Sequence, residues 1–418
     1  MLEQRSASTK FILGMLCDRD NVLSSEQATY NCPECRAPGL EITYDYDGLK
    51  DYMKTNRWLS DSPSMWRYAK LLPCRKWPKV GLYTGATPLI EAGNLARAIG
   101  LETLYVKDDS TNRPTLSYKD RVVATAINKA IEFGFEAVGC VSTGNVANSV
   151  SALAASADIP AFVVVPERTE QGKLIGSLVF GAQVIKVRGN YDDANKLCKE
   201  LVKVNDKVGL MNVNLRSYYA EGAKTVTYEI AEALGWRLPK HIILPLAGAT
   251  LLIKTAKAIA ELQSLGLIDN SPVKIYGSQA VGCAPIANAF EANRSEIVPV
   301  IPSTIASSLA IGNPGDGRGA LIAVRNSGGR IGTAFDREIV EGMELLGRTE
   351  GIFTEAAGGT TVAVARKLVA LGYIPRNEDA VIVITGNGFK TPDPVIGRLN
   401  AIKEIDNDLD QLRRSINH

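Results

Sequence analysis

Residues 108–121 read DDSTNRPTLSYKDR, a polar loop between the strand-like run Leu104–Lys107 and a helix expected from Asp120. Lys119 would lie at the start of that helix, where Asp120 opposes the helix dipole and the positive backbone charge favours a neutral amine. A neutral lysine amine is the form that makes a Schiff base. The alternative is an ordinary lysine at a helix start, and this segment alone favours that simpler interpretation.

The composition predicts a soluble, two-domain protein whose partner is a small molecule. The chain has 418 residues, more than the roughly 250–300 at which single hydrophobic cores stop growing. Its 47 basic residues nearly balance its 45 acidic ones, so we expect neither nucleic acid nor a membrane surface as a partner. The N-terminus lacks an apolar signal segment, and the longest mostly apolar run, Ile242–Ile253, is too short to cross a bilayer. These features predict a cytoplasmic location.

Histidine is nearly absent from the chain. Only His241 and His418 are present, so a Ser-His-Asp or Cys-His mechanism would have almost no histidine available. In an enzyme of this composition, proton transfers would use lysine, carboxylates or a cofactor. The composition therefore favours a chemical role for Lys119.

Three of the seven cysteines, Cys17, Cys32 and Cys35, lie in the first 50 residues. An odd number of cysteines in a long chain indicates reduced thiols. The Cys-Pro-Glu-Cys turn resembles half of a zinc ribbon, but zinc needs four ligands, and Gly14 stands where a paired knuckle would carry a cysteine. We therefore interpret residues 1–50 as an extension resembling a degraded zinc ribbon and predict no metal site, with bound zinc as the alternative.

Beyond about Leu101, short runs rich in β-branched residues alternate with longer amphipathic runs. Alternation on this scale predicts an α/β fold whose parallel sheets are covered by helices on both faces. The expected strands are residues 104–107, 137–140, 161–165, 183–187, 242–245, 274–277 and 380–385. The expected helices include residues 120–133, 191–204, 219–234, 251–265 and 358–371.

Loops that follow the expected strands are candidate binding sites, because ligands of open parallel sheets bind beyond the carboxyl ends of the strands. Ser142, Thr143 and Asn145 follow one strand, and their polar groups and the free N–H groups of the next helix can bind an anion. Plain helix capping is the alternative. A second loop is made of small residues that let a phosphate approach the backbone, although it matches no standard phosphate motif. It consists of Ala247, Gly248, Ala249, Thr250 and Leu251.

Two further segments carry polar groups that could bind a cofactor or a substrate. Thr385 ends the last expected strand before a Gly-Asn-Gly turn, and its hydroxyl can meet a heterocyclic nitrogen, with a tight surface turn as the alternative. Arg216 and Lys224 lie near an expected helix start and could hold a phosphate or a carboxylate. A solvated basic helix start explains them as well.

The order of these elements resembles that of the fold-type-II pyridoxal-phosphate enzymes, and within them the threonine synthase family. The segments that carry the resemblance are residues 114–121, 142–145, 221–225, 304–314, 351–355 and 385–388. The resemblance implies a fold like that of the tryptophan synthase β chain, with two three-layer α/β domains behind the N-terminal extension. A large cofactor-binding domain would comprise residues 51–120 and 230–418, and a small domain residues 121–229.

The resemblance also implies pyridoxal 5'-phosphate as the cofactor, with Lys119 as the lysine that forms the Schiff base. Asn145 would contact the 3-oxygen of the cofactor, and Thr385 would face the pyridine nitrogen. The backbone of Ala247, Gly248, Ala249, Thr250 and Leu251 would hold its phosphate.

The implied reaction converts O-phospho-L-homoserine and water to L-threonine and phosphate. Ser142 and Thr143 would bind the carboxylate of the amino-acid substrate, whereas Arg216 and Lys224 are candidate ligands for its phosphate. Family habit implies a homodimer.

The chain departs from the family pattern at three places near the expected substrate cleft. Tyr83-Thr84-Gly85 stands where many relatives carry Gly-Glu-Gly, Tyr118 where they carry phenylalanine, and Gly248-Ala249-Thr250 where they carry Ser-Gly-Ser. A related lyase or replacement enzyme, such as a serine or threonine dehydratase or a paralogue acting on another activated amino acid, is therefore the second hypothesis. A non-catalytic protein that keeps the fold is the third.

Overall fold

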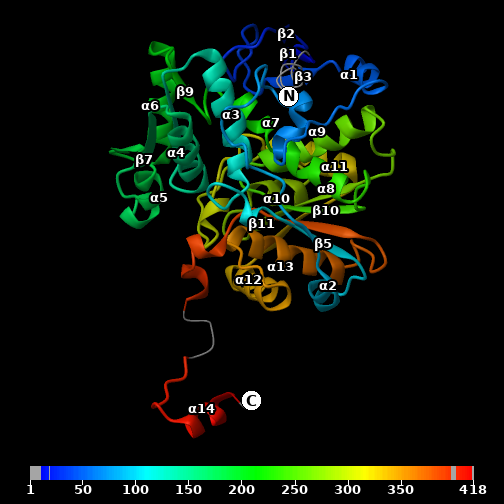
Figure 1. Ribbon diagram of the computed structural model, residues 1–418, viewed down its shortest axis with the longest axis vertical. Coiled ribbons are helices and arrows are strands. Elements are labelled where there is room, and N and C mark those ends of the chain that lie inside the picture. Colours follow the sequence, from blue (N-terminus) through cyan, green and yellow to red (C-terminus); the bar gives the residue numbers. More distant parts are fainter. Residues whose placement is uncertain (1–10, 18, 397–401, 417–418) are drawn as a thin grey trace.

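The computed structural model describes residues 11–17, 19–396 and 402–416, and these residues form three sheets with their covering helices (Figure 1). The strand order is β2-β1-β3 in the first sheet, β8-β7-β6-β9 in the second and β12-β11-β10-β13-β5-β4 in the third. Within the described ranges, no helix combines the length and the apolar character needed to cross a membrane.

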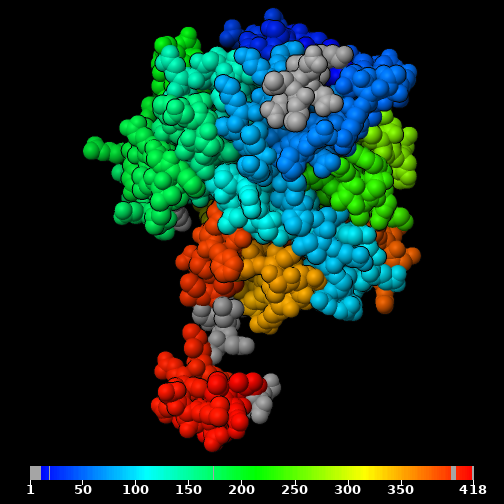
Figure 2. Space-filling view, viewed as in Figure 1, coloured from blue at the N-terminus to red at the C-terminus, as the bar shows by residue number. Residues whose placement is uncertain are grey.

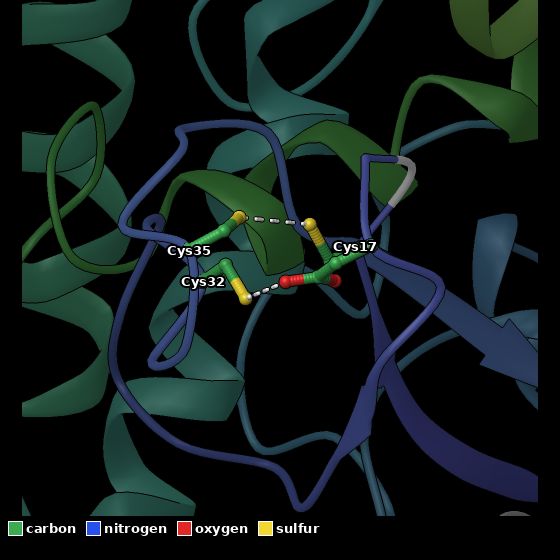
Figure 3. Close-up of side chains that lie close together, drawn as sticks. Cys17, Cys32 and Cys35 are labelled. Carbon is green, nitrogen blue, oxygen red and sulfur yellow. Dashed lines mark hydrogen bonds between the residues drawn. The ribbon is translucent and has the colours of Figure 1, made fainter.

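The N-terminal extension forms the small antiparallel sheet. Its strands are β1 (Ile12–Leu16), β2 (Leu23–Ser24) and β3 (Glu41–Tyr44), and helix α1 (Tyr46–Met53) follows. In the space-filling view the dark blue extension lies at one end of the molecule, against the rest of the chain (Figure 2). The turns of this extension bring its three cysteines together (Figure 3).

The second sheet is parallel throughout and is built only from the middle of the chain. Its strands are β6 (Ala137–Val141), β7 (Ala161–Pro166), β8 (Gln183–Val187) and β9 (Val208–Leu210). Helices α4 (Asn145–Ala157), α5 (Ile175–Val179) and α6 (Tyr191–Val204) alternate with these strands. This is the βα alternation that the sequence predicts.

The third sheet draws its strands from both sides of that segment. Its strands are β4 (Leu89–Glu91), β5 (Leu104–Asp108), β10 (His241–Pro245), β11 (Lys274–Ala280), β12 (Ile331–Ala334) and β13 (Ala380–Ile384), of which β4 alone is antiparallel. Ile242 and Leu244 pack into one hydrophobic cluster while Ile243, between them, packs into another. Both faces are therefore buried, as is typical of parallel sheets.

The remaining helices cover these sheets or connect their strands. They are α2 (Gly93–Ile99), α3 (Lys119–Phe133), α7 (Arg216–Glu221), α8 (Lys224–Ala233), α9 (Thr250–Ser264), α10 (Pro285–Glu291), α11 (Gly317–Ser327), α12 (Asp336–Glu350) and α13 (Ala356–Ala370). Helix α14 (Leu409–Ile416) follows the last strand and covers no sheet, and none of its residues is buried. The predicted boundary at residue 229 falls inside α8. The division into residues 51–120 with 230–418 and residues 121–229 stays a prediction.

The predicted strands and helices are confirmed to within a few residues, apart from one helix. Residues 219–234 were expected to form a single helix, but α7 ends at Glu221 and α8 begins at Lys224. Gly222 lies between them with its Cα against helix α3, and a Cβ there would lie 2.4 Å from the backbone oxygen of Arg121. Gly222 and Ala223 keep helical backbone angles, so the two helices follow one another almost directly.

Candidate active site

Helix α3 begins at Lys119, directly beside the end of strand β13. The N–H of Tyr118 donates to the carbonyl of Thr385 at 3.0 Å, and Ser117 forms a bridge with Gly386. Strand β13 also pairs with β5, which leads into the same loop. The structure thus joins the backbone segment that carries the predicted lysine to the one that carries the predicted strand-end hydroxyl, although they lie far apart in sequence.

The amine of Lys119 contacts tyrosine rather than carboxylate. Its Nζ donates to the hydroxyl of Tyr118 at 2.7 Å and lies 4.4 Å from the centre of that ring. The hydroxyl of Tyr219 is a second neighbour, and burial raises the pKa of Tyr219 while the charge of Lys119 opposes the rise. Lys119 is half-buried and makes no ion pair with any described residue. Its amine is therefore open to a ligand.

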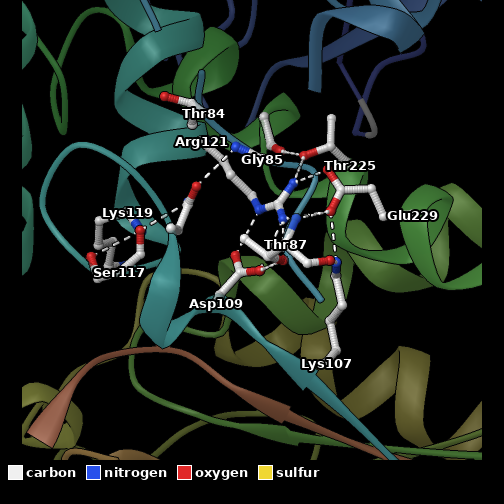
Figure 4. A network of polar contacts seen from close by, with 12 residues as sticks. Thr84, Gly85, Thr87, Lys107, Asp109, Ser117, Lys119, Arg121, Thr225 and Glu229 are labelled. Carbon is white, nitrogen blue, oxygen red and sulfur yellow. Dashed lines mark hydrogen bonds and ion pairs between the residues drawn. The ribbon is translucent and has the colours of Figure 1, made fainter. Parts of the chain in front are cut away.

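Arg121, two residues further on, anchors helix α3 in a buried ion network (Figure 4). It pairs with Asp109 through Nε at 2.6 Å and with Glu229 through Nη1 at 2.6 Å, and all three side chains are buried. Glu229 also accepts from Lys107 at 2.7 Å. Burial opposes the charge of Glu229, but Arg121 and Lys107 lower its pKa to about 2. The network joins α3 to strand β5 and helix α8.

Asp120, between these two residues, connects α3 to the preceding loop and to α4. Its carboxylate accepts from the N–H of Thr115 at 2.8 Å, from the hydroxyl of Thr115 at 2.6 Å and from Ser149 at 2.6 Å. Burial raises the pKa of Asp120 to about 6, although these hydrogen bonds favour the charged form. The position of Lys119 is thus fixed from both sides.

Replacing Asp120 with asparagine is expected to change how stability depends on pH. A folded-state pKa of about 6 lies above the ordinary 3.8, so the folded protein holds this proton more tightly than the unfolded chain does. The stability that Asp120 contributes in acid is therefore lost as the pH rises from about 4 to about 6. We expect the free energy of unfolding of the wild type, minus that of Asp120→Asn, to fall by roughly 2 kcal/mol across this window.

Urea unfolding at about pH 4.5 and about pH 7 measures this difference. The exposed Asp206, changed to asparagine, is the matched control for removing one carboxylate. A difference between wild type and Asp120→Asn that stays constant with pH would contradict the prediction.

Asn145 begins helix α4 and is held by two charged residues. Its Nδ2 donates to Glu355 at 3.0 Å, and its Oδ1 accepts from Lys390 at 2.6 Å. Burial raises the pKa of Glu355 and lowers that of Lys390, whereas the charge of each residue opposes the shift of the other. The backbone N–H of Glu355 donates to Gly386 at 3.0 Å, which connects Asn145 to the turn after Thr385.

The predicted phosphate loop ends in a helix start without a side-chain cap. Ala249 has a left-handed φ of 71°, and α9 then begins at Thr250 with no side-chain hydrogen bond to its first N–H groups. Gly248 has open space where a Cβ would stand, with its closest neighbour 3.9 Å away. Ala249 and Leu251 are 3% exposed. Buried, uncapped N–H groups at a helix start are suited to bind an anion.

Arg216 lies against this loop. Its Nη2 donates to the hydroxyl of Thr250 at 2.8 Å and forms an ion pair with Asp316. Its guanidinium also lies 5.8 Å from the ring of Tyr219, the neighbour of Lys119. The structure therefore places Arg216 between the lysine and the phosphate loop, with Asp316 balancing its charge.

The other predicted substrate ligands differ from one another in their surroundings. Ser142 and Thr143 are half-buried in the loop between β6 and α4, and α4 has no side-chain cap. Lys224 is completely buried, and it pairs with Glu221 at 2.7 Å and with Glu261 at 3.0 Å. None of its ion-pair partners among the described residues belongs to the predicted site. The structure does not bring Lys224 to the other candidates.

These groups fit pyridoxal 5'-phosphate. Lys119 provides an amine without a carboxylate partner, the start of α9 provides buried N–H groups for a phosphate, and Thr385 provides a hydroxyl that makes no hydrogen bond to a described residue. Asn145 provides an amide, but its hydrogen bonds go to Glu355 and Lys390. A cofactor oxygen would have to share that amide with Glu355.

Four residues of this site were not predicted from the sequence. Glu355 lies in a segment that resembles the family and Lys390 lies just beyond another, but their partners are remote in sequence. Tyr219 sits within an expected helix, and Asp316 lies between two glycines, so neither showed a recognisable pattern. Only the packing of distant segments brings these four side chains to the site.

Comparison with known proteins gives one family and several relatives. Residues 80–386 match the family described as pyridoxal-phosphate dependent enzyme. The threonine synthase of Methanocaldococcus jannaschii is 38% identical over 93% of this chain and 95% of its own length. That of Methanosarcina acetivorans is 38% identical over 94% of this chain and 96% of its own length.

Among solved structures, maize serine racemase superposes with a TM-score of 0.61 at 20% identity, covering 81% of this chain and 95% of that protein. A likeness at this identity concerns the fold alone. It confirms the predicted α/β fold of the fold-type-II class.

Proposed function

We propose the reaction of this chain from one premise: the chain belongs to the threonine synthase family of pyridoxal-phosphate-dependent enzymes. On that premise it is an enzyme that converts O-phospho-L-homoserine and water to L-threonine and phosphate. The observation that supports the proposal at the site is the backbone hydrogen bond from Tyr118 to Thr385, which joins the start of α3 to the end of β13. Asn145 joins the same place through Glu355.

Pyridoxal phosphate, when bound, supplies an electron sink for negative charge that develops on the substrate carbons near the amino group. Lys119 would hold the cofactor and then move protons at Cα and Cβ of the substrate. The contacts of its amine with described residues are tyrosine hydroxyls. No described carboxylate forms an ion pair with the amine that would hold it back when it leaves the cofactor and binds a substrate proton. One mobile amine can carry out both proton transfers, so the reaction does not need a histidine.

The cofactor would be held by groups from four loops. The backbone at Gly248, Ala249 and Thr250 would bind its phosphate, and the hydroxyl of Thr385 would face its ring nitrogen. A hydroxyl partner leaves that nitrogen unprotonated, which restrains the electron sink relative to a carboxylate partner. Asn145 would donate to the ring oxygen.

Substrate binding would use the two polar regions beside Lys119. Ser142 and Thr143, with the uncapped start of α4, would bind the carboxylate. Arg216 would bind the phosphate that leaves from Cγ of the substrate before water adds at Cβ. We leave Lys224 out of the proposed site, because Glu221 and Glu261 already neutralise its buried charge.

A related dehydratase or paralogue is the less favoured alternative. The relatives called threonine synthase cover 93% and 94% of this chain at 38% identity, whereas the racemase shares 20%. The departures at Tyr83-Thr84-Gly85 and Tyr118 are therefore interpreted as variation within the family. From the usual assembly of the family we further propose a homodimer. From the sequence we propose a location in the cytoplasm.

Product analysis tests the proposed reaction. The purified protein, supplied with pyridoxal phosphate, is expected to release phosphate and form threonine from O-phospho-L-homoserine in a one-to-one ratio. L-Serine and L-threonine serve as control substrates, with oxoacid formation as the measurement. Turnover of these two amino acids, without phosphate release from O-phospho-L-homoserine, would overturn the proposal in favour of the dehydratase.

A further inference from the structure

The N-terminal extension brings three thiols and one carboxylate together outside the active site (Figure 3). The ligand atoms of Cys17, Asp20, Cys32 and Cys35 all lie within 4.8 Å of one another. The sulfurs of Cys17 and Cys35 are 3.6 Å apart, and the sulfur of Cys32 is 3.3 Å from an oxygen of Asp20. All three cysteines are free thiols.

We propose that Cys17, Asp20, Cys32 and Cys35 bind one zinc ion. In a tetrahedral zinc site with sulfur at about 2.3 Å and oxygen at about 2.1 Å, neighbouring ligand atoms lie about 3.6 to 3.8 Å apart. The two distances above are close to this spacing, whereas a disulfide needs sulfurs about 2.05 Å apart. Thiolate ligands in a tetrahedral set favour zinc over magnesium or calcium.

The two turns that carry these ligands share one backbone hydrogen bond and one left-handed φ angle at the same position. In the first turn, the N–H of Asn21 donates to the carbonyl of Cys17 at 3.0 Å, and Asn21 has a φ of 58°. In the second, the N–H of Arg36 donates to the carbonyl of Cys32 at 3.1 Å, and Arg36 has a φ of 60°. The two turns are therefore equivalent knuckles.

This equivalence identifies the fourth ligand. Asp20 follows Cys17 by the same spacing at which Cys35 follows Cys32, so Asp20 occupies the position of the second cysteine of a pair. From the sequence, that cysteine is expected at Gly14, but Gly14 lies in strand β1 and pairs with Thr43. A carboxylate oxygen is an established zinc ligand and completes a four-coordinate structural site.

The extension between and beyond the knuckles rests on helix α7, which begins with Arg216. Ser217 donates to the carbonyl of Leu40 at 2.7 Å, and Tyr218 donates to that of Gln27 at 3.0 Å. Zinc would fix both turns and thereby hold this part of the extension on α7. Binding would release the protons of the thiols.

Metal analysis of the full-length enzyme tests the site. After reconstitution with Zn²⁺ under reducing conditions and desalting, we expect about one zinc per chain in the wild type and less than half of that in Asp20→Ala. Asp20→Cys is expected to restore full zinc content. Glu34→Ala is the matched control, because Glu34 is an exposed carboxylate in the second knuckle but not in the cluster.

A second measurement covers the case in which Asp20→Ala fails to fold. Titrating the wild type with Co²⁺ is expected to give the visible absorption of tetrahedral cobalt thiolate, and Cys35→Ser is expected to weaken it. A wild type that retains no zinc and gives no such absorption would overturn the proposal. So would an Asp20→Ala protein with wild-type zinc content, or equal losses in Asp20→Ala and Glu34→Ala.

Discussion

Lys119→Ala is expected to abolish both threonine formation and the visible absorption band of the enzyme-bound cofactor. Removing the amine removes the covalent link to the cofactor and the group that moves the substrate protons, so we expect kcat to fall by roughly 10³- to 10⁴-fold or more. Absorption spectra of the purified proteins and phosphate release from O-phospho-L-homoserine measure the two effects.

Lys390→Ala is the matched control, because Lys390 is another amine close to the site. This variant is expected to keep the absorption band even if its activity falls. Borohydride reduction followed by peptide mapping identifies the modified lysine directly. A label on Lys390 or on another lysine, or a band that persists in Lys119→Ala, would refute the role of Lys119.

Arg121→Met is expected to destabilise the folded protein by about 3 to 5 kcal/mol, because it leaves buried carboxylates without their cation. Asp109 loses its ion-pair partner, and Glu229 keeps only Lys107. A typical free energy of unfolding is about 5 to 15 kcal/mol, so a loss of this size is a large fraction of the total. Chemical unfolding of the cofactor-free protein, followed by circular dichroism, measures it.

Arg57→Met is the matched control for this prediction. Arg57 also pairs with a carboxylate, Asp61 at 2.5 Å, but both side chains are exposed, at 66% and 73%. Exposed pairs contribute only about 0 to 1 kcal/mol. If Arg121→Met is insoluble, the same unfolding measurement is made on Arg121→Lys, which keeps the positive charge. Equal stability changes in the Arg57 variant and both Arg121 variants would contradict the prediction.

Features that depend on neighbouring residues could be predicted from the sequence. The strand that ends at Ile384 and the helix that begins at Lys119 follow from local hydrophobic patterns and charge. The α/β class followed from the alternation of such runs. The roles of Lys119, Asn145 and Thr385 came from the family resemblance of short segments and stay predictions.

Features that depend on tertiary contacts could not be predicted in this way. Lys224 and Arg216 are both basic residues near a helix start, yet Lys224 lies in a completely buried ion cluster while Arg216 reaches the phosphate loop. Only the packing of α8 against α9 separates them. Asp20 has the spacing of a ligand in the sequence, but only the matching turns and the distances between side chains identify it as one.

Helix α3 presents Lys119, Asp120 and Arg121 in succession to three different surroundings. Successive residues of an α-helix point about 100° apart, so one residue added inside the helix after Arg121 would rotate these three side chains relative to the rest of α3. Surface loops normally accept insertions. The loop of residues 109–118 is an exception in its sequence, because Asp109, Thr115 and Tyr118 contact Arg121, Asp120 and Lys119 in turn.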